Sequence, residues 1–244
     1  MPSYWRHVNV VLKESEIIIE VLDARHINET RNIEIEKKIE KYGKKLLYVI
    51  NKCDLVGKED LKAAKKHLYP SIFISSKDHL GTTMLKHKIL ELSRGQNTTV
   101  GIVGYPNVGK SSLINALAGR GKARTSSESG FTKGVQKIRV DAKIVVLDTP
   151  GVFPDMEKDT EKFGKTGAVD YAKIKDPEIA ALKLIEEKKE VLEKYFNIIE
   201  EDDEEFLEKI AIKFKKMSKG GIPNIESAAR LILKAWQTGK IKQQ

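Results

Sequence analysis

Two short segments of this chain carry residue types suited to binding a nucleotide, and they stand in an unusual order. Residues 104–111 read Gly-Tyr-Pro-Asn-Val-Gly-Lys-Ser, which places two glycines, a lysine and a hydroxyl at the spacing of a phosphate-binding loop. About fifty residues earlier, residues 51–54 read Asn-Lys-Cys-Asp, an amide and a carboxylate at the spacing that reads the edge of a purine base. In the usual arrangement the phosphate loop opens a domain and the base-reading segment closes it. The two parts of one nucleotide site therefore occur here in exchanged order.

The residues of the phosphate loop each have a physical task. Gly104 and Gly109 permit a tight backbone path that turns successive N–H groups inward, and a helix starting near Lys110 adds the positive end of its dipole. Lys110 should reach the β- and γ-phosphates, while Ser111 offers a hydroxyl to Mg²⁺ and Asp148 holds the same ion from a neighbouring strand. A chance match to this pattern is expected in roughly one chain of this length per hundred. We expect nucleotide contacts from Tyr105, Pro106, Asn107, Val108, Gly109, Lys110, Ser111 and Ser112, and from Asp148 and Gly151.

Selection of the base falls to two other segments. The carboxylate of Asp54 can accept hydrogen bonds from both N1–H and the exocyclic amine of guanine, an edge that adenine does not present. Asn51 can serve the opposite side of the base, the stem of Lys52 can lie along the ring, and Cys53 completes the motif. A four-residue match of this kind is common, and its alternative is an exposed turn. Its place after a buried-type strand, beside a complete phosphate loop, favours guanine, with further backbone donors from Ser75, Ser76 and Lys77.

The elements that must position these segments follow from the hydrophobic pattern. Apolar runs bounded by turn residues alternate with amphipathic segments, which favours βαβ units and a mainly parallel sheet. Ligand-binding loops of such folds follow the carboxyl ends of the strands, where both segments lie. The pattern predicts strands at 17–22, 45–50, 71–74, 98–103, 135–140 and 143–147, helices at 33–42, 58–68, 80–93 and 110–118 between them, and helices at 179–192, 206–214 and 225–236 beyond.

Charge and length divide the chain into two predicted domains. The 244 residues suffice for one α/β domain, residues 1–165, and a smaller helical unit, residues 166–244. Residues 206–244 carry eight Lys and one Arg against two Glu, or 9 − 2 = +7 of the net charge of +9. This basic end indicates either nucleic-acid binding or a solvated helical surface. The candidate RNA contacts are Lys213, Lys215, Lys216, Lys219 and Arg230.

Composition excludes several function classes. The longest apolar runs fall far short of the roughly 18 to 20 residues of a spanning helix, so we expect a soluble protein with no membrane partner. The single cysteine, Cys53, allows neither a disulfide within the chain nor a cysteine-based metal site. A reducing cytosol fits this composition, and we expect a cytoplasmic monomer.

The order of these segments resembles that of the circularly permuted ribosome-assembly GTPases of the YlqF/YawG family. Residues 23–25, Asp-Ala-Arg, are similar to a segment of that family, although Ile27 stands where many members have proline. The tail after Gly220 and Gly221 is similar to the family's helical RNA-contacting module. The resemblance implies a P-loop NTPase sheet with circularly permuted GTPase topology and a small C-terminal all-α domain. The segments that match in order are residues 51–54, 75–77, 104–111, 130–132 and 148–151.

The resemblance also implies a function. A member of this family binds GTP and GDP with Mg²⁺, hydrolyses GTP, and assists assembly of the large ribosomal subunit by contacting ribosomal RNA or a precursor particle. Thr132 and Gly151 would contact Mg²⁺ and the γ-phosphate only in the GTP state, so their release could reorient the basic unit. The catalytic candidates are Lys110, Thr132, Gly151 and Asn107, and the metal ligands are Ser111, Thr132 and Asp148.

The hydrolytic machinery departs from that of small GTPases. Position 152 is Val where those enzymes place a water-orienting glutamine, so we expect slow intrinsic turnover. The resemblance implies a K⁺ ion held by Asn107, and the alternative is a structural Asn that supports the turn. Two other function classes stay open at this point. One is a small-molecule kinase, which would have no use for a guanine code; the other is a nucleotide-bound RNA-binding scaffold with negligible turnover, with which Val152 is compatible.

Overall fold

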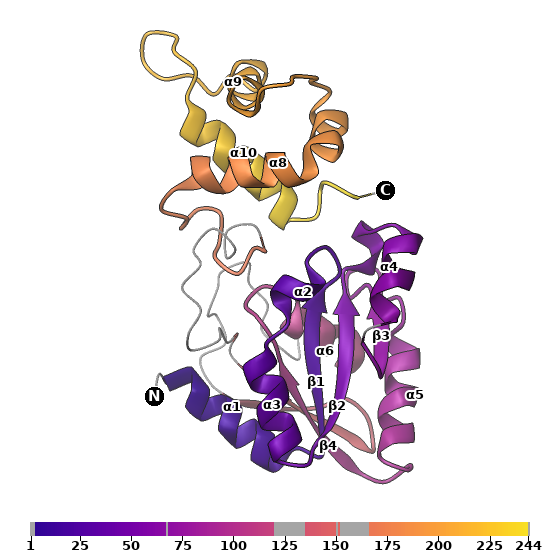
Figure 1. Cartoon of the computed structure of the whole chain (residues 1–244). Coiled ribbons are helices and arrows are strands. Elements are labelled where there is room, and N and C mark those ends of the chain that lie inside the picture. The colour runs from indigo at the N-terminus through magenta and orange to yellow at the C-terminus, as the bar shows by residue number, and fades with distance from the viewer. Residues whose placement is uncertain (1–2, 67, 120–134, 150, 152–165, 244) are drawn as a thin grey trace. The chain divides into compact units, whose positions relative to one another are not determined.

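The computed structural model describes all residues except 1–2, 67, 120–134, 150, 152–165 and 244 (Figure 1). The chain forms two compact units, Met1–Glu157 and Lys158–Gln244. The division between them falls among residues that are not described, and the boundary after residue 165 stays a prediction. Among the described residues, no helix has the length and apolar character needed to cross a bilayer.

The first unit is built on a six-stranded sheet with the order β3-β2-β1-β4-β6-β5. All neighbouring strands are parallel except β5 and β6, which pair antiparallel. Helices lie on both faces of the sheet, so the predicted α/β class is confirmed (Figure 1). The strands are β1 (Ile17–Asp23), β2 (Lys45–Asn51), β3 (Ser71–Ile74), β4 (Thr98–Val103), β5 (Gln136–Arg139) and β6 (Ile144–Asp148).

The helices of this unit cover a sheet whose central strand is buried on both faces. All seven residues of β1 are buried, because β2 and β4 flank it and helices pack above and below. Trp5 and Leu12 of α1 and Ile35 of α3 share one core cluster with Ile18 of β1. The helices are α1 (Ser3–Glu14), α2 (Ile27–Thr30), α3 (Ile33–Lys41), α4 (Lys58–Lys65), α5 (Thr82–Leu92) and α6 (Lys110–Ala118), with a 3-10 turn at η1 (Cys53–Leu55).

One buried acid lies in the middle of β1. Glu20 is fully buried, and its Oε1 accepts a hydrogen bond of 2.7 Å from the backbone N–H of Asn32, the N-cap residue of α3. Its Oε2 has no hydrogen-bond partner among the described residues. The pKa of Glu20 is raised to about 8, mainly by burial and in part by the neighbouring charge of Glu36, while the hydrogen bond from Asn32 opposes the shift. Glu20 therefore keeps its proton at neutral pH.

We expect Glu20→Gln to flatten the pH dependence of stability. The unfolded chain releases this proton above about pH 4.5, whereas the folded chain holds it to about pH 8, so the glutamate costs stability as pH rises through that window. Gln carries no such cost. From pH 5 to pH 8 the variant should gain up to about 4 kcal/mol relative to the natural chain, at about 1.4 kcal/mol per unit. Urea unfolding at several pH values measures this, and parallel curves for the two proteins would contradict it.

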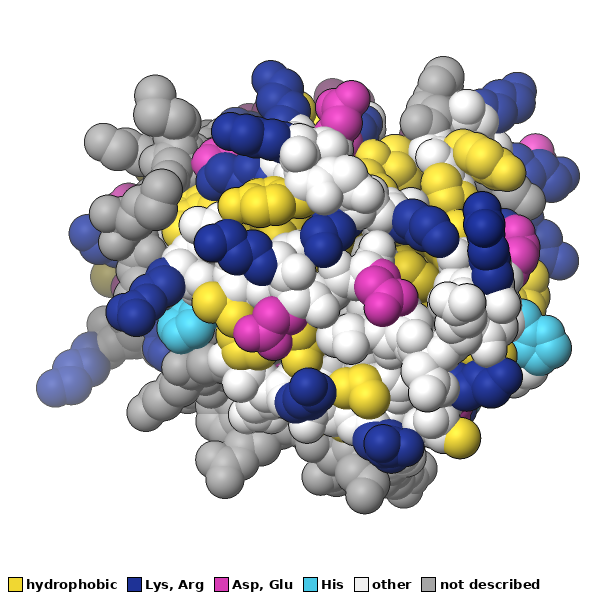
Figure 2. Space-filling model, turned by 90° about the horizontal axis from the view of Figure 1, so that it is seen from below, with side chains coloured by type: hydrophobic (Ala, Val, Ile, Leu, Met, Phe, Trp, Pro, Cys, Tyr) yellow, Lys and Arg dark blue, Asp and Glu magenta, His cyan; other side chains and the backbone are white. Residues whose placement is uncertain are grey.

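Lysines are frequent at the end of the sheet where the parallel strands begin. Seen from below relative to Figure 1, this face carries many Lys and Arg side chains and fewer Asp and Glu (Figure 2). The ammonium of Lys44 donates to the carbonyl of Lys13 at the end of α1, and that of Lys45 donates to the carbonyl of Leu92 at the end of α5. Lys143 donates to the carbonyl of Gly95 in the same way. These lysines satisfy carbonyls that helix ends and turns leave open.

The second unit is helical, with its own core. Its helices are α8 (Pro177–Phe196), α9 (Asp203–Lys213) and α10 (Ile225–Gln237), and Trp236 and Phe206 are fully buried among their apolar side chains. Residues 200–205 are six consecutive acids, of which Asp202 is the N-cap of α9 and the last three form its first turn. The carboxylate of Asp202 accepts hydrogen bonds of 2.9 Å from the N–H groups of Glu204 and Glu205. An acidic first turn stabilises a helix through its dipole, so this run has a structural cause.

Candidate nucleotide site

The predicted nucleotide-binding segments all follow the carboxyl ends of parallel strands. The phosphate loop follows β4, the base-reading segment follows β2, and residues 75–77 follow β3. The registers Asp23↔Asn51 and Asn51↔Ile74 place the ends of β1, β2 and β3 level with one another. The parallel strands drawn in Figure 1 end at one edge of the sheet, so the three segments converge at that edge.

One side chain joins the three segments. Asn51 is 2% exposed, and its Nδ2 donates a hydrogen bond of 2.9 Å to the carbonyl of Val108 in the phosphate loop. Its Oδ1 accepts from the N–H of Ser76 at 3.1 Å and from the hydroxyl of Ser76 at 2.8 Å. A Cβ at Gly109 would lie 2.3 Å from Asn51 Nδ2, so the approach requires glycine at that position. The arrangement holds the phosphate-binding and base-reading sides of the site at a fixed separation.

The phosphate loop has the backbone shape of an anion-binding nest. Asn107 and Gly109 have φ values of 60° and 100°, and Gly109 is the N-cap of α6. Gly104 has φ 141°, and a Cβ there would lie 2.6 Å from the carbonyl oxygen of Val21 in β1. The loop is therefore seated against the central strand with the start of α6 directly behind it. Tyr105, Pro106 and Val108 are buried, while Ser112 is exposed.

Lys110 lies inside this loop. Its ammonium donates hydrogen bonds to the carbonyls of Gly104 at 3.0 Å and Tyr105 at 2.6 Å, and the residue is 7% exposed. Burial lowers the pKa of Lys110 to about 8, although the carboxylate of Asp148 opposes the shift. A phosphate in the loop would give this buried cation a stronger acceptor than two neutral carbonyls.

The end of β6 offers oxygen ligands for a metal ion. Asp148 is 1% exposed, its Oδ2 accepts a 3.4 Å hydrogen bond from the hydroxyl of Ser111, and its Oδ1 has no partner among the described residues. Burial raises the pKa of Asp148. A carboxylate and a hydroxyl are ligands that Mg²⁺ prefers, and a cation would relieve the cost of the buried carboxylate, so this pair fits the ion. Thr132, the third predicted ligand, lies outside the described residues.

The segment after β6 lies against the phosphate loop. A Cβ at Gly151 would lie 2.6 Å from Pro106 Cα and 2.7 Å from Pro106 N, so only glycine fits there. The hydroxyl of Thr149 donates to the carbonyl of Ile102 in β4 at 2.8 Å. The packing of Gly151 against Pro106 places Gly151 close to any ligand of the phosphate loop.

The base-reading residues follow Asn51 at the end of β2. Lys52 has φ 62°, which reverses the chain direction and carries Cys53 and Asp54 into the short turn η1. Both residues are half-buried, and burial raises the pKa of the Cys53 thiol. Ser75 and Ser76 are buried, and Lys77 is exposed.

Sequence reasoning gave no task to Asp23, which the structure places in this site. Its carboxylate is fully buried and accepts a hydrogen bond of 2.8 Å from the ammonium of Lys52. The sequence does indicate that Asp23 ends a buried strand. The other segments of the site also follow strands of this sheet. The resemblance to the family assigns residues 23–25 no chemical role.

The five predicted RNA contacts in the second unit differ in their surroundings. Lys213 donates to the carbonyls of Phe196 at 2.7 Å and Asn197 at 2.9 Å, and so closes the end of α8. Arg230 donates to the carbonyl of Tyr171 at 2.7 Å and pairs with Glu226. In the described part of the chain, no side-chain hydrogen bond or ion pair engages the other three, which lie after α9, namely Lys215, Lys216 and Lys219.

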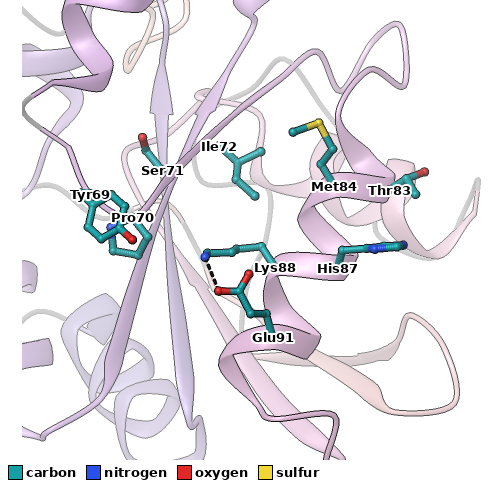
Figure 3. A pocket seen from close by; sticks show the side chains of 9 residues that line it. All are labelled: Tyr69, Pro70, Ser71, Ile72, Thr83, Met84, His87, Lys88 and Glu91. Carbon is teal, nitrogen blue, oxygen red and sulfur yellow. Dashed lines mark hydrogen bonds and ion pairs between the residues drawn. The ribbon is translucent and has the colours of Figure 1, made fainter.

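A groove lies on another part of the first unit. It has a volume of about 490 Å³ and runs between the start of the edge strand β3 and helix α5, as Figure 3 shows. Ile72 and Met84 face each other across it, and Lys88 pairs with Glu91 at 2.6 Å along α5 (Figure 3). The groove is mainly apolar and lies at the opposite end of β3 from residues 75–77. The nucleotide chemistry is therefore not in this groove.

Two family models and a solved structure, all of GTPases, match this chain. A model of the family described as RsgA GTPase matches residues 13–154, and one described as 50S ribosome-binding GTPase matches residues 99–216. The crystal structure of GNP-bound YlqF from T. maritima is 26% identical, with a TM-score of 0.67, over 97% of this chain and 94% of that one.

Two curated relatives match almost the whole chain. The "Uncharacterized GTP-binding protein MJ1464" of Methanocaldococcus jannaschii is 42% identical over 96% of this chain and 65% of its own length. "Nucleolar GTP-binding protein 2" of Yarrowia lipolytica is 35% identical over 97% of this chain and 49% of its own length. The chain thus spans about half to two thirds of the length of these relatives.

The second relative corrects one expectation. The composition led us to expect a cytoplasmic location. This prediction was wrong, because a relative that is similar over almost the whole chain is named as nucleolar. The physical reason is that a lack of disulfides is shared by cytosolic and nuclear proteins, both of which stay reduced. A single cysteine therefore does not distinguish these compartments.

The exchanged order of the motifs, the strand order and the matched families lead to one assignment. The chain belongs to the circularly permuted GTPases of the ribosome-biogenesis family.

Proposed function

We propose that this protein binds GTP with Mg²⁺, hydrolyses it slowly, and acts as a switch during assembly of the large ribosomal subunit. The observation that carries this proposal is the hydrogen bonding of Asn51 to both Val108 and Ser76, which assembles the two halves of a guanine-nucleotide site from a permuted chain. The family descriptions and the relatives' names supply the ribosomal setting.

In this proposal Mg²⁺ is held by Ser111 and Asp148, with Thr132 as a further ligand. The ion would neutralise charge that develops on the β- and γ-phosphates, a role that Lys110 shares from inside the loop. Gly151, whose position against Pro106 leaves no room for a side chain, would sense the γ-phosphate through its backbone N–H. These residues bind and orient the nucleotide, and none of them is a general base.

The proposed turnover is slow because position 152 is Val. The proposal includes a K⁺ ion near Asn107 that shares in charge neutralisation. The left-handed backbone of Asn107, with φ 60°, also supports a purely structural role, because Asn tolerates that conformation better than most residues. Comparing hydrolysis in K⁺ and in Na⁺ separates the two roles.

Single-turnover GTP hydrolysis, with and without ribosomal particles, tests the proposed activity. We expect slow hydrolysis by the protein alone and a faster rate with particles, and a further rise in K⁺ over Na⁺ supports the ion at Asn107. Tight binding with no hydrolysis under any of these conditions overturns the switch. That outcome favours instead a nucleotide-bound RNA-binding scaffold, with which Val152 is compatible.

The surroundings of the five candidate lysine and arginine side chains favour one loop of the second unit for the proposed RNA contacts. Lys213 and Arg230 bond to backbone carbonyls of their own unit, so most of their donors are already used. Lys215, Lys216 and Lys219 lie between α9 and α10, in a loop that also exposes apolar side chains at Phe214, Met217 and Ile222. Cations beside exposed apolar groups suit a single-stranded or folded RNA, which offers both phosphates and base faces.

Replacing Lys215, Lys216 and Lys219 together by Gln should weaken binding to ribosomal RNA and leave GDP affinity unchanged. Each lost phosphate contact also removes a released counterion, so the log-log salt slope should become shallower by about 2.1 on single strands or about 2.7 on a duplex. Titration of fluorescent RNA over a range of KCl concentrations measures both quantities.

The matched control replaces three exposed lysines by Gln. They are Lys58 and Lys62 in α4 and Lys66 directly after it. It removes the same charge from the first unit, and RNA affinity should change much less. Equal losses in the two triple variants would show that only net charge matters. Lys213→Ala serves as a second comparison, because its main effect should be a lower melting temperature of the protein.

A further inference from the structure

Asp23 lies between the two halves of the nucleotide site. The strand that it ends, β1, pairs with β2 on one side and with β4 on the other. The base-reading segment follows β2 and the phosphate loop follows β4. A side chain at the end of β1 can therefore contact both segments.

The backbone of Asp23 is fixed. Its N–H donates to the hydroxyl of Thr30 at 3.1 Å, and the N–H of Ala24 donates to the carbonyl of Asn51 at 2.9 Å. Thr30 in turn donates to the carbonyl of His26 at 2.7 Å. The carboxylate consequently has little freedom to move relative to the sheet.

The carboxylate of Asp23 has every acceptor position in use. Its Oδ1 accepts from the N–H and the Nε of Arg25, both at 3.0 Å, and its Oδ2 accepts from Arg25 Nη2 at 2.7 Å and from Lys52 Nζ at 2.8 Å. Arg25 and Lys52 together hold the pKa of Asp23 far below its usual range, against the effect of burial. Asp23 is a permanently charged, rigid acceptor.

Lys52 connects this acceptor to the phosphate loop. The same ammonium that donates to Asp23 donates to the carbonyl of Asn107 at 3.0 Å. Burial lowers the pKa of Lys52, and Asp23 opposes that shift most strongly. Without the carboxylate, a mostly buried ammonium would retain one neutral acceptor in this contact, and it would gain more by turning to water.

We propose that Asp23 is a positioning residue for guanine-nucleotide binding, which acts by holding Lys52 against the carbonyl of Asn107. Arg25 is its clamp on the opposite side. This arrangement fixes the position of the Lys52 side chain relative to the phosphate loop. In the proposed complex the base lies along the aliphatic part of that side chain. The inference rests on the proposed guanine-nucleotide site and extends it to a segment, residues 23–25, that had no assigned role.

The test is a double-mutant cycle read as GDP affinity. Asp23→Asn should weaken GDP binding about tenfold or more, because Lys52 loses its charged partner. In a Lys52→Ala background the same change should alter affinity less than about twofold, because the residue through which Asp23 acts is gone. A merely structural role for Asp23 would produce the same loss in both backgrounds, and that result overturns the inference.

The control variant is Glu20→Gln. Glu20 is a second fully buried acid of β1, and it contacts α3 instead of the nucleotide site. Its replacement should leave GDP affinity unchanged. Thermal unfolding of each nucleotide-free variant shows whether affinity and stability change together.

A second variant covers the case in which Asp23→Asn fails to fold because Arg25 is left buried without its carboxylate. The double variant Asp23→Asn with Arg25→Met removes both charges, and replacing a whole buried pair costs less than breaking it. It should show the same loss of GDP affinity in the natural background. In the Lys52→Ala background it should again cause little further loss. A natural chain that fails to bind GDP overturns the proposed function itself, whereas a natural chain that binds GDP no better than the Asp23 variants overturns only this inference.

Discussion

Replacing Lys110 by Ala should reduce GTP and GDP affinity by about a hundredfold or more. Lys110 lies within the ring of backbone that the phosphates would occupy, and its ammonium is held by the carbonyls of Gly104 and Tyr105. Removing it leaves the loop with backbone donors and a helix dipole against several negative charges. A loss of about 1.4 kcal/mol corresponds to each tenfold change. Isothermal titration with GDP in the presence of Mg²⁺ measures the loss.

The pH dependence of GDP affinity provides a second test of the role of Lys110. Burial lowers the pKa of Lys110 to about 8, and phosphates would raise it again, so binding takes up a proton when the free site is partly neutral. The GDP affinity of the natural chain should therefore fall as pH rises above about 8. The Lys110→Ala variant should show no such fall. A natural chain whose affinity is flat from pH 7 to pH 9.5 would contradict the role given to this ammonium.

Replacing Asp54 by Asn should reverse the choice of base. A carboxylate accepts from both N1–H and the exocyclic amine of guanine, whereas an amide can accept with one atom and must present donors with the other. Xanthine carries an acceptor in place of that amine, so it matches the amide. We expect GDP affinity to fall about a hundredfold and xanthosine diphosphate to become the preferred ligand, because mismatched buried donors and acceptors are costly.

The comparison variant for this change is Asp78→Asn. Asp78 is an exposed acid near residues 75–77, and its carboxylate is joined to the hydroxyl of Ser75 at 3.0 Å. Its replacement should leave the preference for guanine intact. If Asp54→Asn keeps full preference for GDP over xanthosine diphosphate, the base is read by other residues.

The sequence predicts the positions of the site segments because the site lies at strand ends. The periodicity places strands directly before Asn51, Ser75, Gly104 and Asp148, and parallel strands bring their carboxyl ends to one edge of a sheet. The strands observed there begin and end within one or two residues of those predicted from the hydrophobic pattern. Local patterns therefore suffice for the α/β class and for the convergence of the motifs.

Contacts between distant segments do not follow from such patterns. Nothing local indicates that Asp23 meets Lys52 or that Gly151 lies against Pro106, because each pair depends on strand order and on close packing of loops. The same holds for Lys213 and Arg230, which the basic composition of the tail placed among the RNA contacts. The structure directs both side chains to backbone carbonyls of their own unit. Charge can be counted from a sequence, but the partners of each charge require the fold.

A competition experiment tests the central claim that this permuted chain forms one guanine-nucleotide site. Fluorescent GDP bound to the natural chain is displaced by unlabelled GDP, GTP, ADP or ATP in the presence of Mg²⁺. The carboxylate of Asp54, in a site whose segments Asn51 joins through Val108 and Ser76, predicts that GDP and GTP displace the probe at concentrations at least about a hundredfold lower than ADP and ATP do. Equal displacement by guanine and adenine nucleotides, or failure of the probe to bind, would contradict the account.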